Sequence, residues 1–185
     1  MIKFFAKIIL NFFPNNIKEK IINDYHQSKR NNIAPNWDRN TNFKSKKKIK
    51  IGFVGAGNYS KFHLESLKSI EDVEVDSILS KTGKNTSKLL TRYDIKRSFT
   101  EINKFMERKV DAYFIVSSSD SLFNNAKKLF SKGKPILMEK PPGFNSSQTQ
   151  ELINLAKKYK TFGAVALNRR FYSDLQNGLA MLADH

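Results

Sequence analysis

An α/β fold with a doubly wound, mostly parallel sheet is the fold class that the sequence predicts, with an amphipathic helical extension before it. Short β-rich runs alternate with helical patterns between residues 49 and 167, and a glycine-rich turn follows the first run. Strands that alternate with helices form parallel sheets, because each helix carries the chain back across the sheet by a right-handed crossover. The run Ala112–Val116 is apolar throughout, which is typical of a strand covered on both faces.

The order of the predicted elements follows from these patterns. A further helix opens near Thr100, whose hydroxyl is suited to cap its first turn. The other helices are expected at residues 59–70, 86–93, 122–131 and 147–159. The strands are expected at residues 49–54, 73–79, 111–117, 135–138 and 162–167.

Composition and charge exclude several classes of protein. The 185 residues carry a formal net charge of +16, densest in residues 1–50, which favours anionic partners such as nucleotide phosphates, nucleic acid or acidic lipids. The chain contains no cysteine and only three histidines, far apart in sequence, so disulfides and thiolate sites are excluded and no metal site is expected. No apolar run reaches the roughly 20 residues that a membrane-spanning helix needs. We therefore expect a cytoplasmic protein of one domain with an appendage.

Changes in composition divide the chain into four segments. They are an amphipathic helical extension (1–25), a polar basic linker (26–48), the sheet domain (49–167) and the start of a further domain (168–185). Residues 1–13 predict a helix with a narrow polar stripe, which contains two lysines, and a broad aromatic and aliphatic surface on its opposite side. Such a helix either lies in a membrane interface, as a peripheral contact, or packs on the core, and the sequence leaves both open.

The glycine-rich turn has the pattern Gly-x-Gly-x-x-Ser, directly after a strand and at the start of a helix. Gly55 lets the chain turn sharply, Gly57 lets the backbone approach a pyrophosphate, and Ser60 is small enough for the helix to pack on the strand. Amide groups at the helix start then hold the anion. The turn predicts a Rossmann-type dinucleotide site, with an ordinary βα turn as the alternative. The predicted binding residues are Gly55, Ala56, Gly57, Asn58 and Tyr59.

The end of the second predicted strand indicates which dinucleotide is bound. An NAD site places Asp or Glu there, for the ribose 2′-hydroxyl. This strand instead ends in Ser80 and Lys81. A hydroxyl followed by a cation suits a 2′-phosphate, so NADP is predicted, with NAD as the second candidate. The alternative is that both residues belong to a solvent-exposed turn.

Several motifs together resemble the Gfo/Idh/MocA family of oxidoreductases. Residues 51–67 are similar to the family's first strand and helix, which include a histidine at the position of His63. Residues Glu139, Lys140 and Pro141 are similar to its Glu-Lys-Pro signature after the fifth strand. The resemblance implies that Lys140 lies beside the nicotinamide ribose and the reacting carbon as the catalytic residue, with Glu139 and Pro141 at the cofactor. In the family this proline is often cis.

Each of these motifs also has a simpler interpretation. A lone Glu-Lys-Pro would leave Lys140 as a surface residue, and composition alone makes His63 a packing residue, which is the interpretation we adopt.

Two further stretches carry the resemblance. Ser117, Ser118 and Ser119 follow the strand at 111–117, where the family lines the cofactor with small hydroxyl residues. Asn168 and Arg169 begin the stretch that resembles the family's crossing into its second domain, and polar residues there face the nicotinamide end. Leu122 stands where a histidine is common in the family. An arginine pair at 169–170 taken alone would more often be a solvated surface feature.

The leading functional prediction is the nucleotide-binding half of an NAD(P)-dependent oxidoreductase. It would transfer hydride between the cofactor and a hydroxyl or carbonyl of a sugar-like substrate. The family's catalytic acid/base pair belongs to a second domain, so we expect residues 1–185 to be a fragment or a truncated product, inactive alone. The alternative is a non-catalytic NADP-binding module tethered to a membrane or a partner. The residues encoded after position 185 would distinguish the enzyme from the non-catalytic module. Nucleic acid is not an expected partner, because the sequence contains no nucleic-acid recognition motif.

Overall fold

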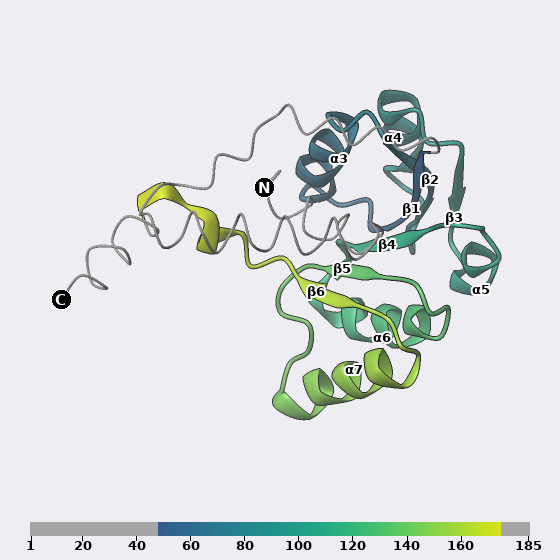
Figure 1. Ribbon diagram of the computed structural model, residues 1–185. Coiled ribbons are helices and arrows are strands. Elements are labelled where there is room, and N and C mark those ends of the chain that lie inside the picture. Colours follow the sequence, from purple (N-terminus) through teal and green to yellow (C-terminus); the bar gives the residue numbers. More distant parts are fainter. Residues whose placement is uncertain (1–47, 175–185) are drawn as a thin grey trace. The chain divides into compact units, whose positions relative to one another are not determined.

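Six parallel strands form one sheet in the computed structural model, which describes residues 48–174 (Figure 1). The strands are β1 (Ile49–Val54), β2 (Val73–Leu79), β3 (Arg97–Phe99), β4 (Ala112–Ile115), β5 (Ile136–Met138) and β6 (Gly163–Val165). The helices are α3 (Ser60–Lys68), α4 (Thr86–Tyr93), α5 (Ile102–Met106), α6 (Ser119–Phe130) and α7 (Ser146–Lys158), followed by the 3₁₀ helix η2 (Asn168–Phe171). The predicted amphipathic extension, the membrane contact at 1–13 and nearly all of the linker lie outside the described residues.

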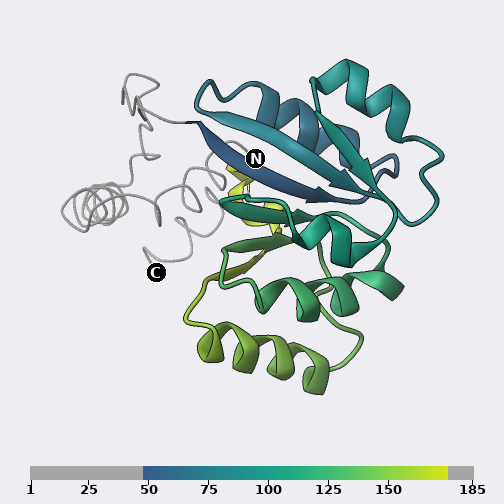
Figure 2. The ribbon, with the colours of Figure 1, turned by 90° about the vertical axis from the view of Figure 1, so that its right-hand side faces the viewer.

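The strand order is β3-β2-β1-β4-β5-β6, and every neighbouring pair is parallel. The chain therefore starts at the centre of the sheet, winds outward in one direction, returns, and winds outward in the other. Figure 2 shows α3 and α4 on one face of the sheet and α6 and α7 on the other. The predicted Rossmann-type, doubly wound parallel sheet is confirmed. Its order reverses between β1 and β4, and open α/β sheets bind their ligands at such a switch point.

Burial on both faces explains why the central strands form. All four residues of β4 are buried. Phe53 and Phe114 stack on one face, with their ring centroids 6.4 Å apart. On the other face Tyr113 meets Phe105 of α5 at 5.8 Å, within the main apolar cluster. The apolar run that begins at Ala112 was predicted to be a strand buried on both faces, and β4 confirms this prediction.

Two predictions about the third crossover are wrong. The sequence indicated no strand at β3, because Arg97 and Ser98 are exposed and polar on an edge strand that pairs only with β2. Thr100 does not cap α5. The amide of Ser80 donates to the carbonyl of Phe99 at 2.9 Å, so the chain is still extended there, and the helix begins after Glu101.

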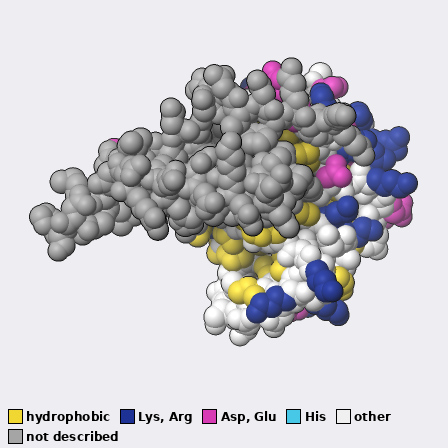
Figure 3. Space-filling model, viewed as in Figure 1, with side chains coloured by type: hydrophobic (Ala, Val, Ile, Leu, Met, Phe, Trp, Pro, Cys, Tyr) yellow, Lys and Arg dark blue, Asp and Glu magenta, His cyan; other side chains and the backbone are white. Residues whose placement is uncertain are grey.

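The residues Ser45–Ala166 form one compact unit, which contains the whole sheet, and the chain from Leu167 belongs to a second unit. Within the described stretch 48–174, no helix is long and apolar enough to cross a membrane. In the same stretch, no group of three acidic, cysteine or histidine residues could hold a metal ion. On the face drawn in Figure 3, Lys and Arg side chains are scattered, with Asp and Glu side chains among them.

Candidate dinucleotide site at the carboxyl edge of the sheet

The carboxyl ends of β2, β1 and β4 lie side by side, next to the point where the strand order reverses. The amide of Gly55 donates to the carbonyl of Leu79 at 2.8 Å, and the amide of Val116 donates to the carbonyl of Val54 at 2.7 Å. One strand further, the amide of Glu139 donates to Ile115 at 2.9 Å. The glycine turn, the serine loop and the Glu139–Pro141 stretch therefore share one edge. Lys140 therefore lies on the same edge as Gly57.

The glycine turn has a different physical requirement at each of its small residues. Gly55 has φ +117°, and a Cβ atom there would lie 2.4 Å from the carbonyl oxygen of Val116. Gly57 is exposed, and a Cβ atom there would have no neighbour within 4 Å among the described residues. Ser60 is fully buried at the start of α3. The turn is thus closed against the sheet at Gly55 and open to a ligand at Gly57, which fits a dinucleotide pyrophosphate.

Two helices begin at this edge. α3 starts directly after the glycine turn, and the twelve-residue helix α6 starts directly after Ser118. Ser118 and Ser119 are exposed, and the Oγ atom of Ser117 accepts a hydrogen bond from Asn125 at 3.4 Å. The positive ends of both helix dipoles favour an anion here.

The loop between β2 and α4 reaches the glycine turn. Ser80 is half-buried and Lys81 is exposed, so the predicted 2′-phosphate contacts are accessible. Asn85, which no sequence motif indicated, donates from Nδ2 to the carbonyl of Ala56 at 3.4 Å. It occupies the N-cap position of α4, but its side chain makes no cap hydrogen bond. An asparagine before a helix predicts a cap, so no local signal indicated this contact.

The Glu139–Pro141 stretch lies at the end of β5. Lys140 is exposed, and its peptide bond to Pro141 is cis, as the resemblance implied. His63, which is 4% exposed, meets Glu139 with 2.6 Å between Nε2 and Oε1. His63 is therefore buried and hydrogen-bonded, and its partner was not evident from the sequence. Asn168 and Arg169 lie in η2, in the second unit, so their place at the cofactor stays a prediction.

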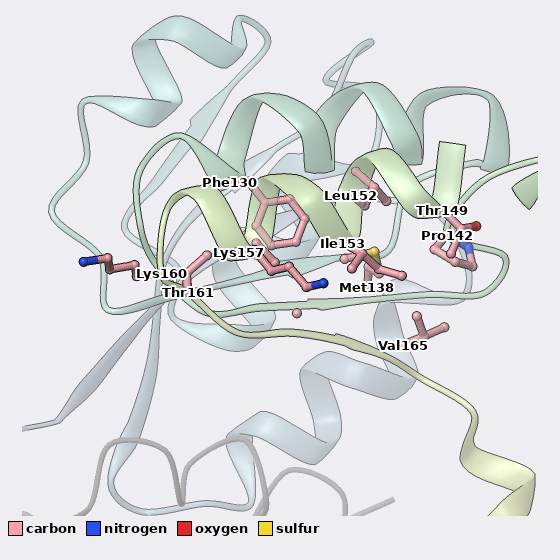
Figure 4. Close-up of a pocket in the computed structure, with 12 residues that line it drawn as sticks. Phe130, Met138, Pro142, Thr149, Leu152, Ile153, Lys157, Lys160, Thr161 and Val165 are labelled. Atoms are coloured by element: carbon pink, nitrogen blue, oxygen red, sulfur yellow. The ribbon is translucent and has the colours of Figure 1, made fainter. Parts of the chain in front are cut away.

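A pocket of about 350 Å³ opens between α7 and the outer strands, separate from the glycine turn (Figure 4). Its walls are Phe130, Met138, Pro142, Thr149, Leu152, Ile153, Ala156, Lys157, Lys160, Thr161, Gly163 and Val165. None of the residues predicted to bind the cofactor lines it. The pocket therefore does not mark the dinucleotide site.

Comparison with known proteins agrees with this geometry. Residues 49–166 match the Gfo/Idh/MocA family model, described as an oxidoreductase family with an NAD-binding Rossmann fold. The chain belongs to this family. The resemblance stated from the sequence motifs is thereby confirmed, and Gfo/Idh/MocA proteins are NAD(P)-binding oxidoreductases.

Relatives of this Gfo/Idh/MocA chain include two curated dehydrogenases. It is 25% identical over 124 residues to the 4-carboxy-2-hydroxymuconate-6-semialdehyde dehydrogenase of Sphingobium sp., covering 66% of this chain and 39% of the relative. It is 24% identical over 110 residues to the NADP(+) scyllo-inositol 2-dehydrogenase IolU of Bacillus subtilis, covering 59% and 34%. The chain thus spans less than half the length of these relatives.

Two solved structures share the fold. The apo scyllo-inositol dehydrogenase of Lactobacillus casei superimposes with a TM-score of 0.69 at 20% identity, covering 76% of this chain and 42% of that one. The WlbA dehydrogenase of Bordetella pertussis, in complex with NADH and UDP-GlcNAcA, gives 0.70 at 16% identity, covering 75% and 42%.

Proposed function

We propose that this chain supplies the NADP(H)-binding part of an oxidoreductase that transfers hydride to or from a hydroxyl or carbonyl group of a sugar-like substrate. The observation that carries the proposal is the open space in front of Gly57 at the switch point of the sheet. Lys140 stands at the same edge, and the chain belongs to a family of NAD(P)-binding oxidoreductases. The scyllo-inositol 2-dehydrogenase among its relatives supports a sugar-like substrate, and the WlbA dehydrogenase, which shares the fold, was solved with UDP-GlcNAcA.

The residues at this edge fit a dinucleotide in three parts. The backbone of residues 55–59 would hold the pyrophosphate, since the position in front of Gly57 is open. Ser80 and Lys81 would bind the 2′-phosphate. Residues 117–119 would lie along the dinucleotide, between the 2′-phosphate and the nicotinamide. Glu139 and Pro141 would stand at the nicotinamide end.

Lys140 would act on the reacting oxygen of the substrate. Its exposed ammonium group is a donor that can orient and polarise a hydroxyl or carbonyl oxygen. The bound nicotinamide supplies the hydride chemistry. We assign the nucleotide-binding domain to residues 49–167 and the start of a substrate domain to residues 168–185. We also propose a cytoplasmic location, with peripheral membrane contact through residues 1–13.

We expect this chain to bind NADPH more tightly than NADH, because a lysine follows the serine at the end of β2 and no acidic residue does. Lys81→Ala should weaken NADPH binding about 5- to 30-fold, the loss of one partly screened charge-assisted hydrogen bond, and NADH binding less than about twofold. Titration of cofactor fluorescence against protein measures both constants.

Lys88→Ala is the matched control for charge. Lys88 is also exposed but lies on α4, beyond the loop that reaches the glycine turn. Its loss should leave the preference for NADPH unchanged. Equal losses of NADPH and NADH binding in Lys81→Ala would show that Lys81 does not contact the 2′-phosphate. A wild-type chain that bound neither cofactor would refute the proposed function.

A further inference from the structure

One buried polar contact links the two halves of the candidate site across 76 positions of sequence. His63 lies on the first turn of α3, the helix that follows the glycine turn, and Glu139 directly follows β5 and precedes Lys140. The side chains of His63 and Glu139 are 5% and 14% exposed. An ionised carboxylate can only accept hydrogen bonds, so with Glu139 ionised the Nε2 atom of His63 donates to Oε1 across 2.6 Å.

The second oxygen of Glu139 extends this contact to the lysine. Oε2 accepts a hydrogen bond from the backbone amide of Lys140 at 3.2 Å. The backbone amide of Glu139 donates in turn to the carbonyl of Ile115 in β4 at 2.9 Å. Glu139 is thus held by α3, by β4 and by its own neighbour. Charge-assisted hydrogen bonds at a largely buried position are stronger and more directional than those at the surface.

Packing alone does not call for this pair. Leu64 and Leu67, which are 1% and 2% exposed, already attach α3 to the sheet. A buried histidine–carboxylate pair adds little net stability over an apolar pair of similar volume, because both groups lose their hydration. What the pair adds is geometry, since it joins the helix after the glycine turn to the residue before Lys140.

We propose that His63 and Glu139 are positioning residues that set the distance between the glycine turn and Lys140. The proposal rests on the proposed function of this edge as a dinucleotide site. With the pair intact, a ligand whose pyrophosphate lies at Gly57 has its nicotinamide end in register with Lys140. A ligand limited to the adenosine side depends instead on the β2–α4 loop and its contact with Ala56, to which the pair does not contribute.

The test compares NADPH with 2′,5′-ADP, which keeps the 2′-phosphate and the adenosine but lacks the nicotinamide half. His63→Leu fills the buried space without a donor, and His63→Gln restores an amide donor close to the position of Nε2. We expect His63→Leu to weaken NADPH binding about tenfold and 2′,5′-ADP binding less than about twofold, measured by isothermal titration calorimetry. His63→Gln should recover most of the NADPH affinity.

Glu139→Gln removes the charge at nearly constant volume and carries the same test if His63→Leu does not fold. It should also lower the ratio of NADPH to 2′,5′-ADP affinity, and His63→Leu in that background should lower it little further.

A parallel loss of both ligands, together with a lower melting temperature, would reduce the pair to a structural role. Unchanged binding of both ligands would also overturn the positioning role. Either result is distinct from failure of the proposed function, in which the wild-type chain binds neither ligand.

Discussion

Gly55→Ala is expected to lower the free energy of unfolding on the order of 3–5 kcal/mol, as the combined cost of backbone strain and a steric clash. At φ +117° an L side chain is strained whatever space surrounds it. The added methyl group would also lie 2.4 Å from the carbonyl oxygen of Val116 and 2.7 Å from its carbon. These atoms are backbone of the chain leaving β4, so they cannot move aside as a flexible side chain can. Urea unfolding followed by circular dichroism measures the loss.

Gly57→Ala is the matched control, since it adds the same methyl group two residues further on. No described atom lies within 4 Å of that position, so stability should stay within about 0.5 kcal/mol of wild type. NADPH binding should nevertheless weaken about tenfold or more, because the methyl group would occupy the space proposed for the pyrophosphate. Wild-type NADPH affinity in Gly57→Ala would place the pyrophosphate elsewhere. Wild-type stability in Gly55→Ala would show that the turn relaxes.

Arg108→Met is expected to cost about 3 kcal/mol of stability at pH 7, the scale for removing one partner of a buried ion pair. The guanidinium of Arg108 donates from Nε to Oδ2 of Asp76 at 2.9 Å and from its terminal nitrogen to Oδ1 at 2.7 Å. The Asp76 side chain is only 2% exposed, so the variant leaves a carboxylate buried without its cation. Adding Asp76→Asn should restore part of the stability by removing that charge.

The pH dependence of this loss has a definite sign. The hydrogen bonds from Arg108 lower the pKa of Asp76 below its ordinary value, against the opposing effect of burial. A carboxyl group with a lowered pKa in the folded state stabilises the protein fully above its unfolded pKa of about 4. That stabilisation disappears as the pH falls through the folded value. The difference in unfolding free energy between wild type and Arg108→Met should therefore be largest near pH 7 and shrink as the pH falls toward and below about 4.

Lys104→Ala is the control for this experiment. Lys104 pairs with Glu101 at 3.0 Å, but both side chains are more than 60% exposed. Solvent screens such a pair, so its loss should change stability by less than about 0.5 kcal/mol. A pH-independent difference in Arg108→Met would assign its cost to lost packing of the side chain and not to the ion pair.

The glycine turn could be predicted from the sequence because its requirements are local. Two glycines and a small residue, placed between a strand and a helix, meet steric requirements that all arise within six positions of the chain. The structure shows these requirements at Gly55, Gly57 and Ser60. The apolar strand at β4 was equally readable, because burial on both faces demands apolar residues at every position.

The missed features have a different origin. β3 is three residues long and lies at an edge, so neither length nor alternation marks it in the sequence. The contacts of Asn85 with Ala56 and of Asp76 with Arg108 join residues 29 and 32 positions apart. No pattern within one element encodes such a pair.

The sequence by itself determined the fold class, the family and the position of the glycine turn, because each depends on periodicity and steric demands within short segments. Only the tertiary structure decided that His63 meets Glu139 and that the side chain of Asn85 reaches Ala56. The physical reason is that right-handed crossovers bring the carboxyl ends of parallel strands together. Which side chains then come within hydrogen-bonding distance depends on the register of strands far apart in the chain, and local patterns do not specify that register.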